Sequence, residues 1–381
     1  MSQARHQPKH EKIRQEIRHA ITTGKYKEGQ RLPTEAVLVK QYDTSRPTVA
    51  RALRDLQHEG LIARRAGSGT YVQKAGNEHG HLFGLLIPRL GETEIFDPIC
   101  REMARSSQTS HHGLLWAASA VEATGDVAEQ AWQSCQQCIA RKVAGVFFAP
   151  IEYTSDADAA NERIMNALEK AGIPVVLLDR DLQRSPRHSK YDRVGIDNRE
   201  AGFMVTEHLL KQGSRRVGFF SRPFSAETVA ARLEGYRAAL LSHGIVPEDS
   251  WHAEGDPADS QLVKEFLRNS RVDGLVCAND ITAANLMRSM DSLGIKTPED
   301  VKVVGIDDVR YASLLAVPLT TLHQPCESIG IAAVQAMTDR IANRAMPARD
   351  ILFHCELVVR ESCGAKLREP VAAPSSRPAR K

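Results

Sequence analysis

Hydrophobic positions near the start of the chain recur at helical spacing. The apolar face of a first helix, expected over residues 10–23, consists of Ile13, Ile17, Ala20 and Ile21. A second, short helix is expected after Pro33, with Thr34 as its N-cap and with Val37 and Leu38 facing inward. The pattern therefore predicts two helices before residue 43.

A third helix is expected to begin at about Arg46. Ser45 is a favourable N-cap, and Pro47 falls in the first turn, where its missing N–H costs no helical hydrogen bond. At 100° per residue, one narrow face is apolar and comprises Val49, Ala52, Leu53 and Leu56. The opposite face and its flanks carry Arg46, Pro47, Thr48, Arg51, Arg54 and His58. One side of this helix is thus suited to a core and the other to a polyanion.

Two short strands follow the third helix. Gly60 is the expected C-cap, and residues 61–65 and 69–73 have the pattern of two strands joined by a glycine-rich turn. Three helices and such a hairpin form a winged helix-turn-helix, whose third helix can enter the major groove of DNA. Gly67 and Gly69 would let the wing approach the sugar-phosphate backbone.

The pattern changes after a polar segment at residues 74–80, which reads as a linker. Beyond it, eight short aliphatic runs alternate with helical segments, which is typical of parallel α/β sheets buried on both faces. About 280 residues exceed one compact unit, so we expect two sheets. The runs are LFGLLIP, LLWAAS, VAGVFFAP, IPVVLLD, VGIDN, RRVGFFS, DGLVCAN and VKVVGID.

Polar residues follow several of these runs, at the carboxyl ends of strands where α/β proteins bind ligands. They are Asp179, Arg180, Asn279, Asp280, Asp307 and Asp308. Carboxylate, amide and guanidinium groups suit a polyhydroxylated ligand. For Asp280 a helix N-cap is the favoured interpretation over ligand contact.

Charge is concentrated at the front of the chain. Residues 1–76 contain 15 Lys and Arg against 7 Asp and Glu, whereas the rest of the chain has a net charge of −5. Such a basic segment is typical of a module that meets phosphates, although a solvated basic surface without a partner gives the same count.

Several classes of protein are disfavoured. No run of about 18 apolar residues could span a bilayer, and the first 20 residues lack an apolar signal core, so we expect a cytoplasmic location without membrane contact. Seven scattered cysteines suit reduced thiols, and the pair Cys135 and Cys138 lacks the further ligands of a zinc site. No Walker, GxSxG or HExxH motif occurs, so we expect neither an enzyme nor a metal or other cofactor.

The first module resembles the GntR-type bacterial transcription regulators. The shared pieces are Leu32-Pro33-Thr34-Glu35, Ser45-Arg46-Pro47-Thr48-Val49, Leu56-Gln57-His58-Glu59-Gly60-Leu61 and Arg65-Ala66-Gly67-Ser68-Gly69-Thr70-Tyr71-Val72. The resemblance implies DNA contacts from Arg46, Thr48 and Gly67. The full set we expect at DNA is Thr34, Ser45, Arg46, Pro47, Thr48, Arg51, Arg65, Gly67, Ser68 and Gly69. Ala36 and Ala50 stand where the family often has arginine, so the base sequence cannot be transferred.

Residues 81–362 resemble the LacI/GalR-type effector domain, a relative of periplasmic sugar-binding proteins. The matching pieces include Val194-Gly195-Ile196-Asp197-Asn198, Arg232-Leu233-Glu234-Gly235-Tyr236, Ala278-Asn279-Asp280, Val304-Gly305-Ile306-Asp307-Asp308 and Leu319-Thr320-Thr321-Leu322. The resemblance implies that Arg232 and Asp307 bind the effector, joined by Asn279 and Thr228. Phe96 is either an aromatic wall for a sugar or a core residue. The expected effector set is Phe96, Arg180, Thr228, Arg232, Asn279 and Asp307.

This combination is similar to the AraR-like repressors. It implies a winged helix-turn-helix domain over 1–73, an effector and dimerisation domain over 81–363, and a disordered tail over 364–381. The first subdomain is expected over 81–192 and 320–348, and the second over 193–319 and 349–363. The expected partners are operator DNA, a small sugar such as a pentose, and a second copy of the chain. The alternatives are a nucleoside or sugar phosphate acting as corepressor, and a pyridoxal phosphate enzyme fused to the same DNA-binding module.

Overall fold

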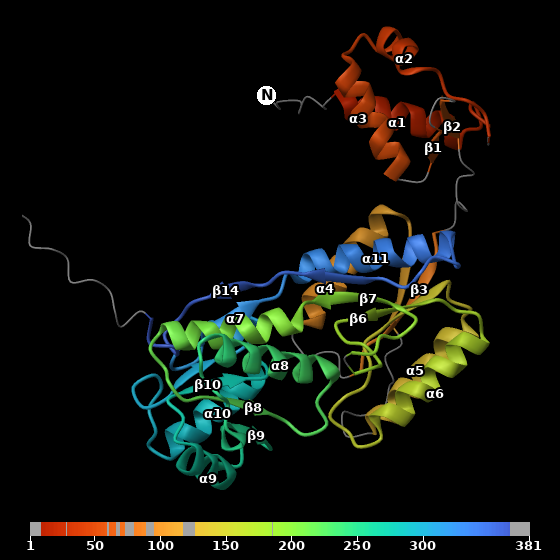
Figure 1. The fold of residues 1–381 in the computed structure, drawn as a ribbon. Coiled ribbons are helices and arrows are strands. Elements are labelled where there is room, and N and C mark those ends of the chain that lie inside the picture. The colour runs from red at the N-terminus through yellow and green to blue at the C-terminus, as the bar shows by residue number, and fades with distance from the viewer. Residues whose placement is uncertain are drawn as a thin grey trace, which may run out of the picture. The chain divides into compact units, whose positions relative to one another are not determined.

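The computed structural model describes residues 9–27, 29–58, 61–65, 69–72, 80–88, 95–116, 126–184 and 186–365. The chain divides into two compact units (Figure 1). The first comprises residues 1–80 with 110–112, and the second comprises residues 81–109 with 113–381. Gly60, Gly67, Ser68, the linker at 74–79 and the tail after residue 365 lie outside the described residues.

The first unit contains the predicted helices and wing. Its elements are α1 (Lys9–Thr22), α2 (Glu35–Gln41), α3 (Arg46–His58), β1 (Ile62–Arg65) and β2 (Gly69–Val72). Strands β1 and β2 pair antiparallel, with Ile62 opposite Val72 and Arg65 opposite Gly69. The segment before α2 lies beside β2, because Leu32 N–H donates to Thr70 O at 2.8 Å. The wing is therefore continuous with the chain that leads into α2.

The core of the first unit lies on the predicted face of α3. Val49, Ala52, Leu53 and Leu56 are all buried, and they pack with Ile13, Ile17, Ile21, Leu32, Leu38, Ile62 and Val72. One expectation is wrong: Val37 is 50% exposed, so only Leu38 of that pair faces inward. A helix of seven residues makes barely two turns, and adjacent positions on it point about 100° apart.

The second unit contains a six-stranded sheet whose strand pairs are all parallel. Its order is β13-β7-β6-β5-β3-β4. The strands are β3 (Leu82–Leu86), β4 (Gly113–Trp116), β5 (Gly145–Phe148), β6 (Val175–Leu178), β7 (Asp192–Ile196) and β13 (Asp350–Phe353). Helices α4 (Phe96–Thr109) and α11 (Cys326–Ala342) cover one face, and α5 (Val127–Ala140) and α6 (Ala157–Lys170) cover the other (Figure 1).

A second, four-stranded parallel sheet has the order β11-β10-β8-β9. Its strands are β8 (Val217–Ser221), β9 (His252–Glu254), β10 (Gly274–Cys277) and β11 (Lys302–Val304). The helical elements of this half are α7 (Asn198–Lys211), α8 (Glu227–Ser242), α9 (Ser260–Ser270), α10 (Asp280–Ser292) and two short 3₁₀ turns, η1 (Asp249–Trp251) and η2 (Arg310–Ser313). Strands β12 (Thr321–His323) and β14 (Glu356–Val358) pair antiparallel.

All eight aliphatic runs form strands, as predicted. The central strands β5, β6, β8 and β10 are buried along their whole length, because helices cover both faces of each sheet. Strands β9, β12, β13 and β14 were not predicted. They are only three or four residues long and contain polar residues, so they lack an aliphatic run.

The boundary between the two subdomains differs from the expected one. Strand β7 extends to Ile196 and pairs with β6, and β13 pairs with β7 in parallel register from Asp350 to Phe353. Both strands therefore belong to the first sheet, although residues 193–196 and 350–353 were expected in the second subdomain. The chain changes sheets after β7, between β12 and α11, and between β13 and β14.

Helices α7 and α8 pack at very close range through two glycines. A Cβ atom on Gly202 would lie 2.0 Å from Arg232 O, and one on Gly235 would lie 2.0 Å from Arg199 O. Any larger residue at either position would push the helices apart. This contact brings Asn198, at the start of α7, within reach of the Arg232 side chain.

Candidate effector-binding cleft and DNA-binding face

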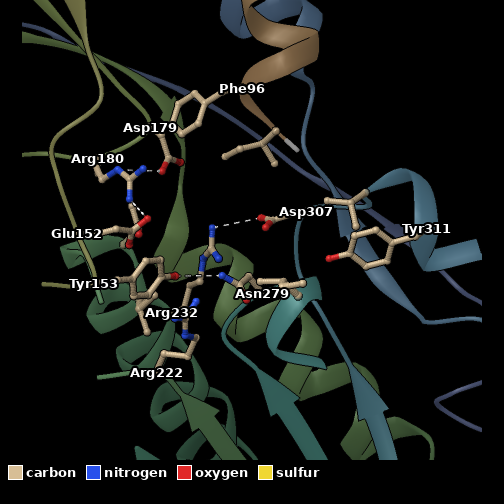
Figure 2. A pocket seen from close by; sticks show the side chains of 15 residues that line it. Phe96, Glu152, Tyr153, Asp179, Arg180, Arg222, Arg232, Asn279, Asp307 and Tyr311 are labelled. Carbon is tan, nitrogen blue, oxygen red and sulfur yellow. Dashed lines mark hydrogen bonds and ion pairs between the residues drawn. The ribbon is translucent and has the colours of Figure 1, made fainter. Parts of the chain in front are cut away.

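A cavity of about 360 Å³ lies in the second unit, where the carboxyl ends of strands from both sheets converge. Its size falls in the lower part of the range of small-molecule pockets, about 300–1,000 Å³. The lining residues are Ile95, Phe96, Glu152, Tyr153, Asp179, Arg180, Arg222, Thr228, Val229, Arg232, Asn279, Ile281, Asp307, Val309 and Tyr311. Figure 2 shows the polar members pointing toward one another.

Arg232 is held rigidly in this cavity. Its Nε donates to Asn198 Oδ1 at 2.8 Å and its Nη1 donates to Ala278 O at 2.5 Å. Its Nη2 lies 3.7 Å from Asp307 Oδ1, an ion pair rather than a hydrogen bond. Because two nitrogens have protein partners and the side chain is buried, the remaining N–H groups are aimed at the cavity without freedom to turn away.

Asp307 lies opposite Arg232 on the loop that follows β11. Gln324 Nε2 donates to its Oδ1 at 2.7 Å, and its backbone has φ of 130°, a conformation that few non-glycine residues adopt. Burial raises the pKa of this carboxyl, and the Arg232 guanidinium opposes that rise. Asp179 and Tyr153 also have positive φ, at 68° and 62°. Three strained residues on one cavity are typical of a functional site.

Asp179 and Arg180 line a second wall, where Arg180 Nε lies 3.9 Å from Asp179 Oδ2, and each residue has a buried polar atom without a hydrogen-bond partner. Asp179 Oδ1 and Arg180 Nε accept or donate no hydrogen bond among the described residues. Arg180 forms an ion pair with Glu152. Burial raises the pKa of Asp179 to about 7, and burial together with Arg232 lowers the pKa of Arg180 to about 10. Unpartnered buried groups cost free energy, which a polar ligand would recover.

Aromatic side chains complete the cavity. Phe96 is fully buried in the core and also lines the cavity, with the Arg180 guanidinium 5.5 Å from its ring centre. Its core role is confirmed, and its role as an aromatic wall for a sugar stays a prediction. Asn279 Nδ2 donates to Tyr153 Oη at 3.2 Å, and burial raises the pKa of Tyr153. Aromatic faces beside hydroxyl-binding groups suit a sugar ring, which has C–H faces and a polar edge.

Asp280 is not the N-cap of α10. Asn279 is the N-cap, and its Oδ1 accepts from Thr282 N at 3.0 Å. Asp280 is the first helical residue, is fully buried, and accepts from Thr321 Oγ1 at 2.6 Å and Val309 N at 3.0 Å. The N-cap prediction for Asp280 is therefore wrong by one position. Asn279, which was expected only as an effector-binding residue, caps the helix instead.

The structure brings all six predicted effector residues, namely Phe96, Arg180, Thr228, Arg232, Asn279 and Asp307, to one cavity. Their role in binding stays a prediction. Sequence reasoning missed Glu152, Tyr153 and Arg222, although each closely follows the end of a predicted strand and the same strand-end rule applies to them. Tyr311 comes from η2, which no periodic pattern marks.

The predicted DNA-binding residues of α3 lie around its N-terminus, except Arg51, which lies in the second turn. Ser45, Arg46, Pro47 and Arg51 are exposed, and Thr48 is half-buried with its Oγ1 2.7 Å from Ser45 Oγ. Thr34 is the exposed N-cap of α2 and makes no side-chain capping bond. Gly69 begins β2 with φ of 124°. The Arg65 side chain, Gly67 and Ser68 lie outside what the structure describes.

An ion pair joins the wing to α2. Arg64 Nη2 lies 3.0 Å from Glu35 Oε1, so one wing arginine is partly neutralised within the protein. The exposed cations Arg46, Arg51 and Arg54 have no carboxylate within 4 Å among the described residues. They lie along one side of α3, which suits the phosphates and base edges of a DNA groove.

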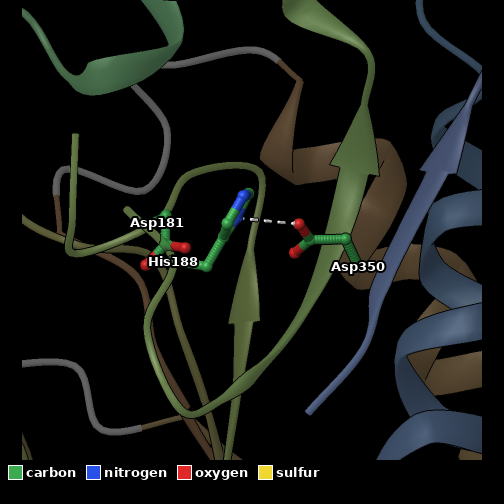
Figure 3. Close-up of side chains that lie close together, drawn as sticks. All are labelled: Asp181, His188 and Asp350. Carbon is green, nitrogen blue, oxygen red and sulfur yellow. Dashed lines mark ion pairs between the residues drawn. The ribbon is translucent and has the colours of Figure 1, made fainter. Parts of the chain in front are cut away.

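One group of potential metal ligands occurs in the described part of the chain (Figure 3). Asp181, His188 and Asp350 have ligand atoms within 4.8 Å of one another. Asp181 already accepts from three backbone N–H groups, those of Leu182, Gln183 and Ser189. Asp350 accepts two hydrogen bonds from Arg193, at 3.0 and 3.1 Å. Both carboxylates are therefore occupied by protein groups, and this cluster needs no cation.

Cys135 and Cys138 are buried in α5, and burial raises the pKa of each thiol, to about 11 and about 12. Burial thus favours the protonated form of both thiols near neutral pH, which is the less nucleophilic form. Among the described residues, no helix has the length and apolar character needed to cross a bilayer.

Comparison with known proteins agrees with this architecture. Residues 9–72 match the family of bacterial regulatory proteins named gntR, and residues 206–363 match the periplasmic binding protein-like domain. The chain is 27% identical over 373 residues to the arabinose metabolism transcriptional repressor of Geobacillus stearothermophilus, covering 93% of this chain and 97% of that protein. It is 32% identical over 206 residues to the transcriptional repressor PurR of Edwardsiella ictaluri, covering 53% of this chain and 60% of that protein.

Solved structures show the same fold. The transcriptional regulator CelR in complex with cellobiose has a TM-score of 0.63 at 21% identity, covering 87% of this chain and all of that one. The transcription regulator GntR of Chromobacterium violaceum has a TM-score of 0.58 at 25% identity, covering 74% of this chain and 98% of that one.

The fold and the matches define the class: the chain is a transcriptional regulator that joins a gntR-family helix-turn-helix domain to a periplasmic-binding-protein-like domain. Its similarity to the Geobacillus arabinose repressor runs through both domains, whereas the chain spans about 60% of the length of the Edwardsiella PurR relative.

Proposed function

We propose that the protein is a repressor that binds operator DNA as a homodimer and leaves it when a small sugar occupies the cleft of the second unit. The observation that carries this proposal is the cavity where both sheets end, in which Arg232, Asp307 and Asp179 present fixed polar groups. Bidentate guanidinium and carboxylate groups bind adjacent hydroxyls of a polyol. The arabinose repressor and the cellobiose-bound structure of CelR support a sugar.

Ligand binding can act on DNA because the cavity is walled by both subdomains. A ligand that contacts both would favour one arrangement of the two sheets over others, and three chain segments connect the sheets. In a dimer on an inverted repeat, half-sites lie about one DNA turn apart, so a shift of a few ångströms would release one DNA-binding domain. The coupling must be reciprocal: operator DNA weakens ligand affinity by the same factor.

A second candidate is a nucleoside or sugar phosphate that strengthens DNA binding. The similarity to the PurR repressors, which match about half of this chain at up to 32% identity, supports a second class of effector. A pyridoxal phosphate enzyme has less support, because no lysine lines the cavity among the described residues and a Schiff base needs one. An absorbance change on adding pyridoxal phosphate would revive that alternative.

A thermal-shift screen of sugars, nucleosides and sugar phosphates tests the proposal. A ligand at 100 times its dissociation constant stabilises the second unit by about 2.7 kcal/mol. Thr228→Val removes a buried cavity hydroxyl with little change in shape and should reduce that shift, whereas Arg237→Gln, on the exposed side of α8, should not. The proposal fails if no small molecule both shifts the melting temperature and changes DNA affinity.

A further inference from the structure

The three arginines of the cavity differ in how their charge is compensated. Arg180 is paired with Glu152, and Arg232 is paired with Asp307. Arg222 has no carboxylate within 4 Å among the described residues, and its guanidinium instead lies 4.5 Å from the centre of the Tyr153 ring. Of the three, Arg222 alone is left with an uncompensated charge.

Arg222 is also held in place. It directly follows β8, and Ser225 Oγ donates to its backbone carbonyl at 2.6 Å. Tyr153, on which the guanidinium rests, is fixed by Asn279 Nδ2 at 3.2 Å and by its own N–H, which donates to Phe224 O at 2.7 Å. Stacking on a ring face leaves the N–H groups at the edge of a guanidinium available to a ligand.

Resting on the proposed function, we propose that the effector is a polyhydroxylated acid whose carboxylate or phosphate is bound by Arg222. Its hydroxyls would meet Arg232 and Asp307 across the cavity. A planar guanidinium binds either kind of anion through two parallel hydrogen bonds, which makes it selective as well as strong. A neutral sugar would leave this cation without a partner inside the cleft.

The electrostatics of the opposite wall support an acidic ligand. Asp179 is the remaining carboxyl of the cavity, and it lies beside Arg180, 3.9 Å from Nε, rather than beside Arg222. Burial raises its pKa to about 7, so near neutral pH part of the population carries no charge there. The cleft then has more positive than negative charge, and an anion balances it.

Calorimetric titration of the full chain with matched compounds tests this inference. Each set contains an aldopentose or aldohexose, its aldonate, its uronate where one exists, and its phosphate ester. The variants are Arg222→Gln, which removes the charge, and Arg222→Lys, which retains the charge without the planar fork. Arg268→Gln, at an exposed arginine on α9 that does not line the cavity, is the control.

In at least one set the acid should bind more tightly than the neutral sugar. Arg222→Gln should weaken that acid by about 10- to 100-fold, the range for a hydrogen bond to a charged group, and leave the neutral sugar unchanged. Arg222→Lys should retain part of the preference, and Arg268→Gln all of it. Comparing the affinities of the aldonate and uronate with that of the phosphate ester identifies which anion the protein binds.

The inference is overturned if no acid in any set binds more tightly than its neutral parent, which includes the case in which no acid binds. It is also overturned if Arg222→Gln weakens neutral and acidic members equally. A neutral sugar that binds and still changes DNA affinity would then leave the proposed function standing without an acidic effector. Loss of every ligand effect on DNA would instead contradict the proposed function itself.

Discussion

Asp179→Asn should change how the stability of the second unit depends on pH. Only 6% of the residue is exposed, and burial raises the pKa of its carboxyl from 3.8 to about 7. Between these two values the unfolded chain loses the proton while the folded protein keeps it. The free energy of unfolding therefore falls as pH rises through this window and is level above it.

The size of the effect follows from the width of that window. At about 1.4 kcal/mol for each pH unit, Asp179 lowers the wild-type stability by at most roughly 4 kcal/mol between about pH 4 and about pH 7. Asparagine has nearly the same shape and never ionises, so the variant lacks this loss. It should be the more stable protein at about pH 8 and lose its advantage toward about pH 4.

Urea unfolding followed by tryptophan fluorescence measures this difference, because Trp251 is buried in the second unit. Wild type and variant are compared across the window, with Asp249→Asn, an exposed aspartate, as the control that should leave the pH profile unchanged. Parallel stability curves for wild type and Asp179→Asn would show that the buried carboxyl ionises normally, and the reasoning would be refuted.

Three further substitutions test the contributions of the two units separately. Arg46→Ala should weaken DNA binding and reduce the slope of log affinity against log salt by about one, with ligand affinity unchanged in calorimetry. Leu53→Ala should lower the unfolding free energy of the first unit alone by about 2–5 kcal/mol, measured by urea denaturation. Asn198→Ala removes the acceptor of Arg232 Nε and should weaken ligand binding by about 10-fold or more, while DNA affinity without ligand stays constant.

Much of the fold could be predicted because its elements carry strong local patterns. The apolar face of α3 and the eight aliphatic runs specify burial by themselves. Strands β12, β13 and β14 could not be found this way, since their partners are distant in sequence and their residues are partly polar. The subdomain boundary was misplaced for the same reason, because β13 joins the first sheet through pairing with β7.

The candidate site was predictable where the family motifs supplied residues, as for Arg232 and Asp307. The contact of Glu152 with Arg180 joins the loops after two neighbouring strands of the first sheet, and that of Arg222 with Tyr153 joins loops from the two different sheets. No local pattern encodes either contact. The Glu35 and Arg64 ion pair likewise joins positions 29 residues apart in sequence.

The central claim is that one ligand in the cleft of the second unit controls DNA binding by the first. The most direct measurement is the affinity of the full chain for a DNA fragment selected from a random-sequence pool, with and without the tightest ligand from the calorimetric sets. We predict an inverted-repeat preference and a change in affinity of about 5- to 150-fold, matched by the same change in ligand affinity when DNA is present. Equal affinity for all DNA sequences, or an affinity that the ligand leaves unchanged, would contradict the account.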